Sequence, residues 1–218
     1  MLNKEQITTL YRKRAKRYNF TANLYYLIGF RESAYRKKAV EALDLHKGST
    51  IVEIGCGAGI NFPLFQEAVG MEGKIIGVDL TDAMLEMARL RIEKKNWDNV
   101  ELVHSDASLF QYPPDINGII STFAITLIPE FDTVIRNGCR SLREGGRWVI
   151  LDLKKPSNWL AKLEPLYLFI TRPFGVTKDI SFRHPWESIE KYMEDTSFHE
   201  LFWGFSYLSV GIKGSKSC

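Results

Sequence analysis

From residue 50 onward, the chain alternates short runs of β-branched residues with helical stretches, and this alternation restricts its fold more than any other feature. The β-branched runs are mostly continuous, as in strands buried on both faces of a parallel sheet. Strands that alternate with helices form right-handed βαβ units, so we predict a doubly wound α/β fold. The predicted parallel strands are residues 50–54, 74–79, 100–103, 116–122 and 147–153.

The end of the chain departs from this alternation. Residues 199–203 and 207–212 are strand-like runs separated by a short turn that contains Gly204. Two adjacent strands without a helix between them pair antiparallel. We therefore predict a seven-stranded sheet that is mostly parallel and ends in an antiparallel C-terminal hairpin.

The length of 218 residues fits a single domain. We divide it into a basic helical lid (1–47), a ligand-binding core (48–154), an aromatic helical cap (155–196) and the hairpin (197–218). The sequence has no run of 18 uncharged apolar residues and no signal peptide, so we expect a cytoplasmic protein.

The cysteines and histidines indicate neither disulfides nor metal. Cys56, Cys139 and Cys218 are scattered and form no C-x-x-C pair, as expected in a reducing compartment without structural disulfides. The four histidines have no metal-ligand spacing. We expect no metal site.

Positive charge is concentrated near the N-terminus. Residues 1–47 carry a local net charge of +7, whereas the whole chain carries +3. Basic and aromatic side chains interleave over residues 4–38, so an anionic membrane surface is a candidate partner, with the protein peripheral on the inner face of the membrane. A solvated helix face and a hydrophobic lid are the alternatives. The overall charge is too small to indicate nucleic acid.

A glycine-rich turn, VEIGCGAGIN at residues 52–61, joins the first predicted strand to a helix. Its glycines let the backbone turn tightly and approach a ligand where a Cβ atom would clash. Asp79 ends the second predicted strand, where an acidic residue accepts hydrogen bonds from ribose hydroxyls. The G-x-G-x-G spacing differs from the dinucleotide motif, and Glu53 would repel a pyrophosphate. Glu53 instead suits an amino group, which indicates S-adenosyl-L-methionine.

The sequence resembles class I S-adenosylmethionine-dependent methyltransferases. EIGCGAG at 53–59 matches the first motif of that family, and GVDL at 77–80 with Met84 matches the second strand and its helix. HSDA at 104–107 matches the loop whose acidic residue contacts adenine, and LREGGR at 142–147 matches the turn before the fifth strand. The resemblance implies a Rossmann-like fold and methyl transfer.

Within that family the chain looks most similar to the ubiquinone/menaquinone C-methyltransferases and the bacterial phosphatidylethanolamine N-methyltransferases. The similarity lies in YRKRAKRYN at 11–19, GFR at 29–31 and LDLKKP at 151–156. Asn19 stands where the quinone group usually has Asp, and STFAI at 121–125 differs from that group's polar signature. The resemblance implies a lipophilic acceptor, either a phospholipid amine or an isoprenoid quinone ring.

The resemblance also implies candidate site residues. Tyr18 is a candidate hydrogen-bond donor to an acceptor phosphate or hydroxyl, Asp152 a candidate to orient a substrate amine, and His184 a candidate base. These three are the candidate catalytic residues. The candidate cofactor-binding residues are Tyr11, Tyr18, Glu53, Gly55, Cys56, Gly57, Gly59, Asn61, Asp79, Leu80, Met84, Asp106, Ala107, Thr122 and Phe123.

Two other functions remain open from the sequence. One is a methyltransferase of a soluble small molecule, and the other is a non-catalytic module that binds the cofactor or a lipid surface. A nucleic-acid methyltransferase is not expected, because no Asn/Asp-Pro-Pro-Tyr/Phe motif follows the fourth strand.

Overall fold

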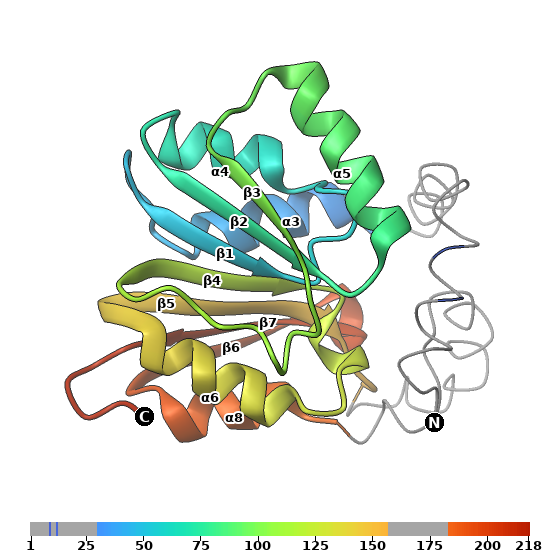
Figure 1. Ribbon diagram of the computed structural model, residues 1–218. Helices are drawn as coiled ribbons and strands as arrows, with labels where there is room; N and C mark the ends of the chain where they lie inside the picture. The colour runs from blue at the N-terminus through green and yellow to red at the C-terminus, as the bar shows by residue number, and fades with distance from the viewer. Residues whose placement is uncertain (1–8, 10–11, 13–29, 157–182) are drawn as a thin grey trace.

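A computed structural model describes residues 9, 12, 30–156 and 183–218 of the chain. This part is built on a seven-stranded sheet with strand order β3-β2-β1-β4-β5-β7-β6 (Figure 1). Strands β1 to β5 run parallel, and β7 runs antiparallel to β5 and β6, which confirms the predicted fold class. The strands are β1 (Thr50–Ile54), β2 (Lys74–Asp79), β3 (Val100–His104), β4 (Ile116–Thr122), β5 (Leu142–Leu153), β6 (Asp195–Leu201) and β7 (Ser206–Ile212).

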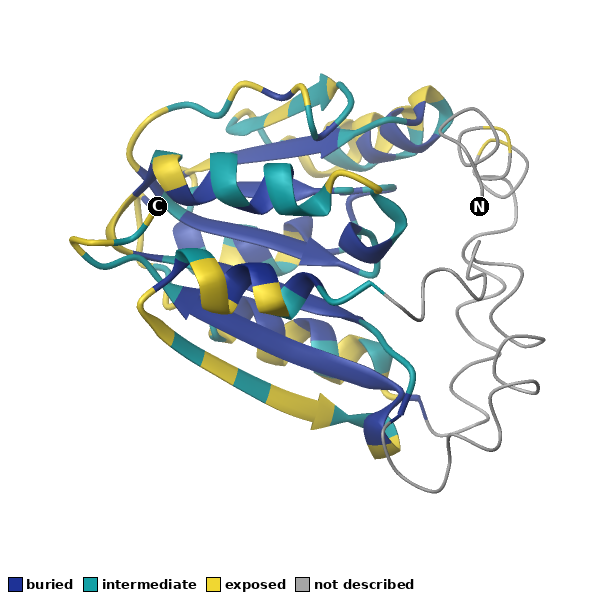
Figure 2. Cartoon of the chain, turned by 90° about the horizontal axis from the view of Figure 1, so that it is seen from below, coloured by how far each residue is buried: buried dark blue, intermediate teal, exposed yellow. Residues whose placement is uncertain are grey.

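Helices cover both faces of the sheet (Figures 1 and 2). Successive side chains of a strand point to opposite faces, so Ile51 packs in one apolar cluster with Phe62 and Phe65, and Val52 packs in the other with Ile135. The first cluster lies under α3, α4 and α5, and the second under α6 and α8. The helices are α3 (Glu32–Glu41), α4 (Phe62–Val69), α5 (Asp82–Lys95), α6 (Phe131–Ser141) and α8 (Pro185–Tyr192).

The strand order reverses between β1 and β4. From β1 the chain continues to β2 and β3 on one side of the sheet, and it returns through β4 to the other side. The carboxyl ends of β1 and β4 therefore diverge into loops that lead away from each other. In open α/β sheets, ligands bind at this switch point.

Several strand boundaries differ from the sequence prediction. β3 ends at His104, β7 begins at Ser206, and β6 ends at Leu201, because residues 202–204 form a 3-10 turn instead of strand. β5 begins at Leu142 rather than at residue 147, because Leu142 pairs with Ile116 before the register shifts and Arg147 pairs with Gly118. β6 begins at Asp195, where antiparallel pairing with Ile212 extends the strand beyond the predicted run. Pairing with a neighbouring strand fixed these boundaries, and local composition did not.

The four-part division of the chain stays a prediction. Of residues 1–47, the structure describes Thr9, Arg12 and the part from residue 30 onward, which includes α3. Of the aromatic cap, it describes α8 and the residues around it. The remaining residues of the predicted lid and cap lie outside the described part of the chain.

One expectation about the cysteines is wrong. Cys139 and Cys218 form a disulfide, with their Cα atoms 6.3 Å apart, and Cys56 is free and buried. The tail after β7 returns to the last turn of α6, so the fold joins two cysteines that are 79 positions apart. Among the described residues, no helix is long and apolar enough to cross a bilayer, and no group of acidic, His or Cys side chains could hold a metal ion.

Candidate active site

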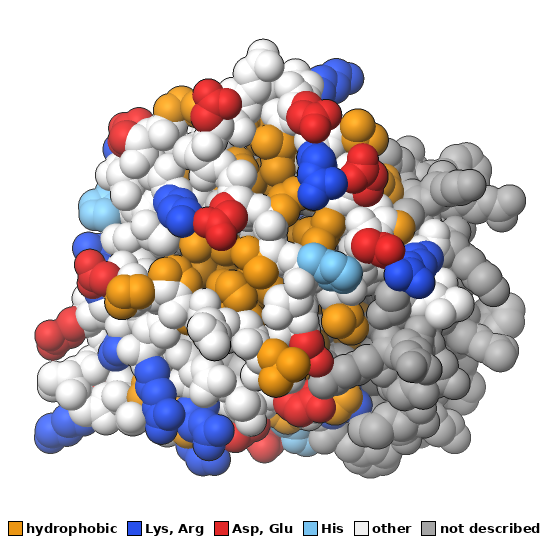
Figure 3. All heavy atoms as spheres, in the orientation of Figure 1, with side chains coloured by type: hydrophobic (Ala, Val, Ile, Leu, Met, Phe, Trp, Pro, Cys, Tyr) orange, Lys and Arg blue, Asp and Glu red, His pale blue; other side chains and the backbone are white. Residues whose placement is uncertain are grey.

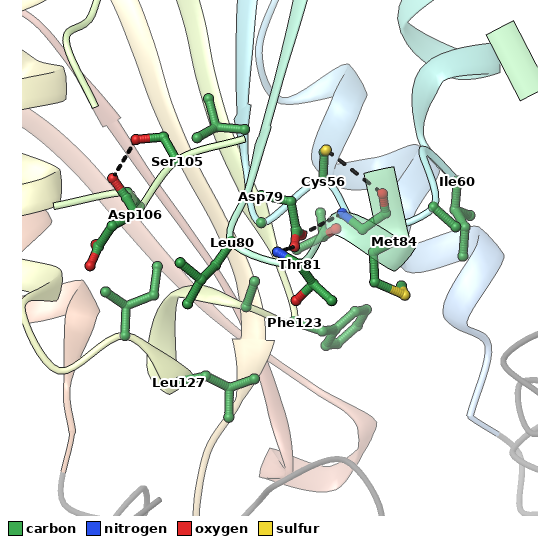
Figure 4. Close-up of a pocket in the computed structure, with 18 of the residues that line it drawn as sticks. Cys56, Ile60, Asp79, Leu80, Thr81, Met84, Ser105, Asp106, Phe123 and Leu127 are labelled. Atoms are coloured by element: carbon green, nitrogen blue, oxygen red, sulfur yellow. Dashed lines mark hydrogen bonds between the residues drawn. The ribbon is translucent and has the colours of Figure 1, made fainter. Parts of the chain in front are cut away.

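An open pocket lies at the carboxyl ends of β1, β2 and β4 (Figure 4). Its empty volume is about 950 Å³, which includes open solvent at its mouth. The sequence-predicted residues that line it are Gly55, Cys56, Gly57, Asp79, Leu80, Met84, Asp106, Ala107, Thr122 and Phe123.

The glycine-rich turn forms one wall of this pocket. Gly55 adopts a φ of 71° and donates its N–H to the Val78 carbonyl at 2.8 Å. A Cβ atom at Gly55 would lie 2.3 Å from the Cβ of Ala124, so only glycine lets the β1 turn approach the segment after β4 this closely. The turn therefore closes the pocket between two strand ends.

Asp79 holds the turn in place from the end of β2. Its Oδ2 accepts the N–H of Gly57 and its Oδ1 accepts the N–H of Thr81, both at 2.8 Å. Burial raises the pKa of Asp79, and these two backbone donors oppose that rise. A carboxylate offers about four acceptor positions, so Asp79 retains capacity for the hydroxyls of a ribose.

Glu53 lies behind the pocket wall and is 1% exposed. Its Oε1 accepts hydrogen bonds from Asn61 at 2.5 Å and from Thr122 at 3.3 Å. Its Oε2 is buried and has no hydrogen-bond partner among the described residues. Burial raises the Glu53 pKa to about 7, although the nearby Arg36 lowers it. An unpartnered buried carboxylate oxygen fits a cationic ligand such as the amino group of S-adenosyl-L-methionine.

Arg36 of α3 is a pocket residue that the sequence reasoning missed. Its Nη1 donates to the Thr122 hydroxyl at 2.6 Å and to Asn61 Oδ1 at 3.2 Å, and its Nε donates to Glu32 at 2.8 Å. The guanidinium lies 5.1 Å from the ring centre of Phe123. Several basic residues neighbour Arg36 along the chain, and no periodicity indicates which of them turns inward.

An apolar wall lines part of the pocket. Leu127, the last residue of the 3-10 turn η1 (Ile125–Leu127), lines the pocket together with Ala124 before the turn and Ile128 and Pro129 after it. The sequence reasoning missed them as well, although the rule that ligands bind beyond strand ends could have indicated the loop after β4. Asp106, on the opposite side, accepts the N–H of Ser108 at 2.9 Å.

Two candidate catalytic residues lie outside the pocket lining. Asp152 is buried, and its Oδ2 and Oδ1 accept the backbone N–H groups of Thr126 at 3.0 Å and Leu153 at 2.7 Å. Burial raises its pKa to about 6. His184 pairs with Glu187 at 2.8 Å and stacks on Trp186, at the start of α8. Their catalytic roles stay predictions that this placement does not support.

The other predicted residues divide into two groups. Gly59 and Asn61 support the glycine-rich turn without lining the pocket; a Cβ atom at Gly59 would lie 2.6 Å from the Phe62 ring. Tyr11 and Tyr18 lie outside the described residues.

Arg12 belongs to the basic N-terminal segment, and its side chain contacts helix α5. Its guanidinium makes two hydrogen bonds of 2.8 Å to the carboxylate of Asp82, in the first turn of α5. This pair holds the Asp82 pKa at about 2. Both side chains are exposed, so the pair contributes little to stability.

The sheet order, the glycine-rich turn and the acidic residue ending β2 define an S-adenosylmethionine-dependent methyltransferase, and the comparisons agree with that class. A crystal structure of a SAM-dependent methyltransferase from Aquifex aeolicus has a TM-score of 0.57 at 18% identity, covering 81% of this chain and 88% of that one. This likeness supports the Rossmann-like fold.

Sequence comparison identifies the family. The model of the ubiE/COQ5 methyltransferase family matches residues 1–213, so the chain belongs to this family. The demethylmenaquinone methyltransferase of Listeria welshimeri is 25% identical over 182 residues, which are 80% of this chain and 77% of the relative. The ubiquinone/menaquinone biosynthesis C-methyltransferase UbiE of Francisella tularensis is 26% identical over 183 residues, 81% of this chain and 73% of that protein.

Proposed function

We propose that the acceptor of this methyltransferase is lipophilic and is the ring of an isoprenoid quinone precursor. The family match over residues 1–213 carries the proposal, together with relatives named for methylation in menaquinone or ubiquinone biosynthesis. The apolar wall of Leu127, Ile128 and Pro129 supports it, because an apolar ring is stabilised against such a surface.

The chain's own residues would position the reactants. S-adenosyl-L-methionine supplies an electrophilic methyl group on a sulfonium sulfur. Glu53 would accept a hydrogen bond from the amino group of the cofactor, Asp79 would hold the ribose, and Asp106 would face the adenine. Holding two reactants in line can supply about 7–11 kcal/mol of the barrier. A ring carbon activated by a phenolate oxygen would form the new bond to the methyl carbon as the carbon–sulfur bond breaks, and the proton on that ring carbon would then leave to solvent. No described residue is assigned as a dedicated base.

Labelled methyl transfer tests the acceptor class. The protein is incubated with methyl-labelled S-adenosyl-L-methionine and a total lipid extract, and the products are separated by chromatography. We expect label in the quinone fraction. Label in phospholipid would replace the quinone with a phospholipid amine, and label only in water-soluble products would overturn the lipophilic acceptor.

A matched pair of variants shows that the label comes from this site. Asp79→Ala removes the carboxylate that holds the glycine-rich turn and should abolish transfer. Asp98→Ala removes an exposed carboxylate after α5 and should leave transfer unchanged. Calorimetry that detects no S-adenosyl-L-methionine binding to the unaltered protein would contradict the site assignment itself.

We also propose that residues 4–38 bring the protein to an anionic membrane surface. On the face in Figure 3, acidic and basic side chains of described residues are mixed over most of the surface, and several basic side chains gather at the lower left. Replacing the basic residues next to Arg12 with Gln should abolish binding to anionic vesicles, whereas replacing two exposed lysines of α5 should not. Unchanged binding in the first variant would contradict the proposal. The first set is Lys13, Arg14, Lys16 and Arg17, and the control set is Lys94 and Lys95.

A further inference from the structure

Arg36 of α3 is a buried cation that lines the cofactor pocket. The residue is 6% exposed, and its guanidinium lies 5.1 Å from the ring centre of Phe123, which lines the same pocket. Arginine is almost never this buried unless it is paired. The partners of its guanidinium nitrogens therefore indicate what this side chain does in the pocket.

A guanidinium offers five N–H donors, and those of Arg36 have different partners. Nε donates to Glu32 at 2.8 Å, and Nη1 donates to Thr122 at 2.6 Å and to Asn61 at 3.2 Å. The two N–H groups of Nη2 have no acceptor in the part of the chain that the structure describes. Two donors of this cation are therefore free to bind a ligand.

These two donors are open to the pocket. Arg36 lines the pocket, and none of its nitrogens is among the described polar atoms that are fully buried without a partner. Since Nη2 has no partner, it must retain contact with solvent. A ligand in the pocket can therefore reach Nη2 directly.

The hydrogen-bond network of Arg36 also contains a free acceptor. Thr122 and Asn61 accept hydrogen bonds from Arg36. The same two side chains donate to Oε1 of Glu53, whose Oε2 has no partner among the described residues. Free donors and a free carboxylate oxygen thus lie on opposite sides of one pair of polar side chains. A ligand that satisfies both carries an anionic and a cationic group close together, as the amino-acid end of S-adenosyl-L-methionine does.

We propose that Nη2 of Arg36 binds the carboxylate of S-adenosyl-L-methionine, so that helix α3 completes a cofactor site whose other residues follow the strand ends. Glu32 occupies the Nε side of the guanidinium and leaves Nη2 for a second carboxylate. Charge-assisted hydrogen bonds of this kind are about twice as strong as neutral ones. The inference concerns the cofactor alone, so it does not depend on which acceptor is methylated.

The test compares two ligands that differ in one group. Calorimetry measures the Kd of S-adenosyl-L-methionine and the Kd of its decarboxylated form, which keeps the amino group, the sulfonium and the adenosine. Hydrogen bonds to a charged group change affinity by about 10–100-fold. We therefore expect the unaltered protein to bind the decarboxylated form about 10–100-fold more weakly.

Arg36→Gln should reduce the ratio of these two Kd values to about 1. Loss of the bonds to Thr122 and Asn61 disturbs the pocket for both ligands, so this structural effect cancels in the ratio. Lys37→Gln removes an exposed positive charge from the next position of α3 and is the matched control, with the ratio of the unaltered protein.

Arg36→Lys is the second variant, and it serves if Arg36→Gln does not fold. It keeps the positive charge but replaces the planar fork with a single ammonium, so the ratio should lie between those of Arg36→Gln and the unaltered protein. A ratio as large as in the unaltered protein would mean that charge alone acts, and it would overturn the hydrogen bonds from Nη2.

Other results would overturn the proposal as well. An undiminished ratio in Arg36→Gln would mean that another group binds the carboxylate, and a ratio near 1 in the unaltered protein would mean that no group does. An unchanged Kd for S-adenosyl-L-methionine in Arg36→Gln, with a raised KM for the acceptor, would place the guanidinium against the acceptor instead.

Discussion

The ends of β1 and β5 each carry a buried carboxylate, Glu53 and Asp152, but the two differ in their hydrogen bonds. They are 1% and 4% exposed, and burial raises their pKa values to about 7 and about 6. Both oxygens of Asp152 accept backbone N–H groups. In Glu53, Oε2 is buried without a partner among the described residues.

This difference separates a ligand site from a structural one. Asp152 lies outside the pocket lining, and its oxygens fix the backbone of Thr126 and Leu153 beside the pocket wall. Asp79 also accepts two backbone N–H groups, but it lines the pocket, where its remaining acceptor positions face a ligand. A buried oxygen left unsatisfied costs about 1–3 kcal/mol and persists where a ligand completes it. Burial and a raised pKa alone do not distinguish the two cases.

The largest effect on stability should come from a substitution that creates a steric clash between the ends of β1 and β4. In Gly55→Ala, the new Cβ would meet that of Ala124, two residues before the Thr126 that Asp152 holds. We expect a loss of about 3–5 kcal/mol in unfolding free energy, from overpacking and a left-handed alanine. Denaturant unfolding measures it.

The rescue variant for this clash is Ala124→Gly. Added to Gly55→Ala, it should recover the overpacking part and leave about 1–2 kcal/mol from the positive φ. A Gly55→Ala protein with unchanged stability would mean that the ends of β1 and β4 do not touch in solution.

Removing the unsatisfied carboxylate should affect binding rather than folding. Glu53→Gln keeps the acceptor for Asn61 but puts an amide donor where the cofactor's amino group would approach. We expect the Kd for S-adenosyl-L-methionine to rise about 10–100-fold by calorimetry, with the melting temperature unchanged or raised. Glu101→Gln, an exposed carboxylate paired with Lys74, is the charge-matched control and should bind normally. Normal affinity in Glu53→Gln would rule out this contact.

Removing the carboxylate of Asp152, whose oxygens accept backbone N–H groups, should reduce stability and leave cofactor binding unchanged. In Asp152→Asn, one backbone N–H would face the amide nitrogen, which costs about 1–3 kcal/mol in unfolding free energy and leaves cofactor affinity unchanged. Asp195→Asn, at the exposed start of β6, is the control. A stable Asp152→Asn protein that binds cofactor but has lost methyl transfer would restore Asp152 as a catalytic residue.

A further effect is a pH dependence of stability in the absence of cofactor. Both carboxyl pKa values are higher in the fold than in the unfolded chain, so the unfolded chain releases protons first and stability falls as pH rises from about 4 to about 7. Each group contributes at most about 1.4 kcal/mol per pH unit. Arg36 and Asp79 face Glu53 and act in opposite directions.

The two variants assign this pH dependence to its sources. Unfolding in denaturant at several pH values should show that Glu53→Gln lowers the slope between about pH 4.5 and pH 7 and that Asp152→Asn lowers it between about pH 4 and pH 6, so that the slope near pH 6–7 comes from Glu53. Curves that keep the slope of the unaltered protein in both variants would refute the buried, neutral forms of these carboxyls.

The part of the site that the sequence predicted is local in the chain. Gly55, Gly57 and Asp79 follow directly from strand ends and a short motif, because a tight turn and a strand-end acid are properties of a few consecutive residues. Asp152 fits the same strand-end rule, but its side chain faces a backbone turn instead of the pocket. A position at a strand end brings a residue near the pocket, but the packing around it determines whether its side chain lines the pocket.

Local sequence patterns predict the order of strands and helices, the C-terminal hairpin and the glycine-rich turn, since hydrophobic periodicity and the conformational freedom of glycine act over short distances. Only the tertiary structure decided that Arg36 turns into the pocket, that Cys139 meets Cys218, and that Phe30 joins Phe123 to the β6–β7 turn. These contacts join residues far apart in the chain. They depend on how the helices and turns pack at the edges of the sheet, and no local pattern encodes that.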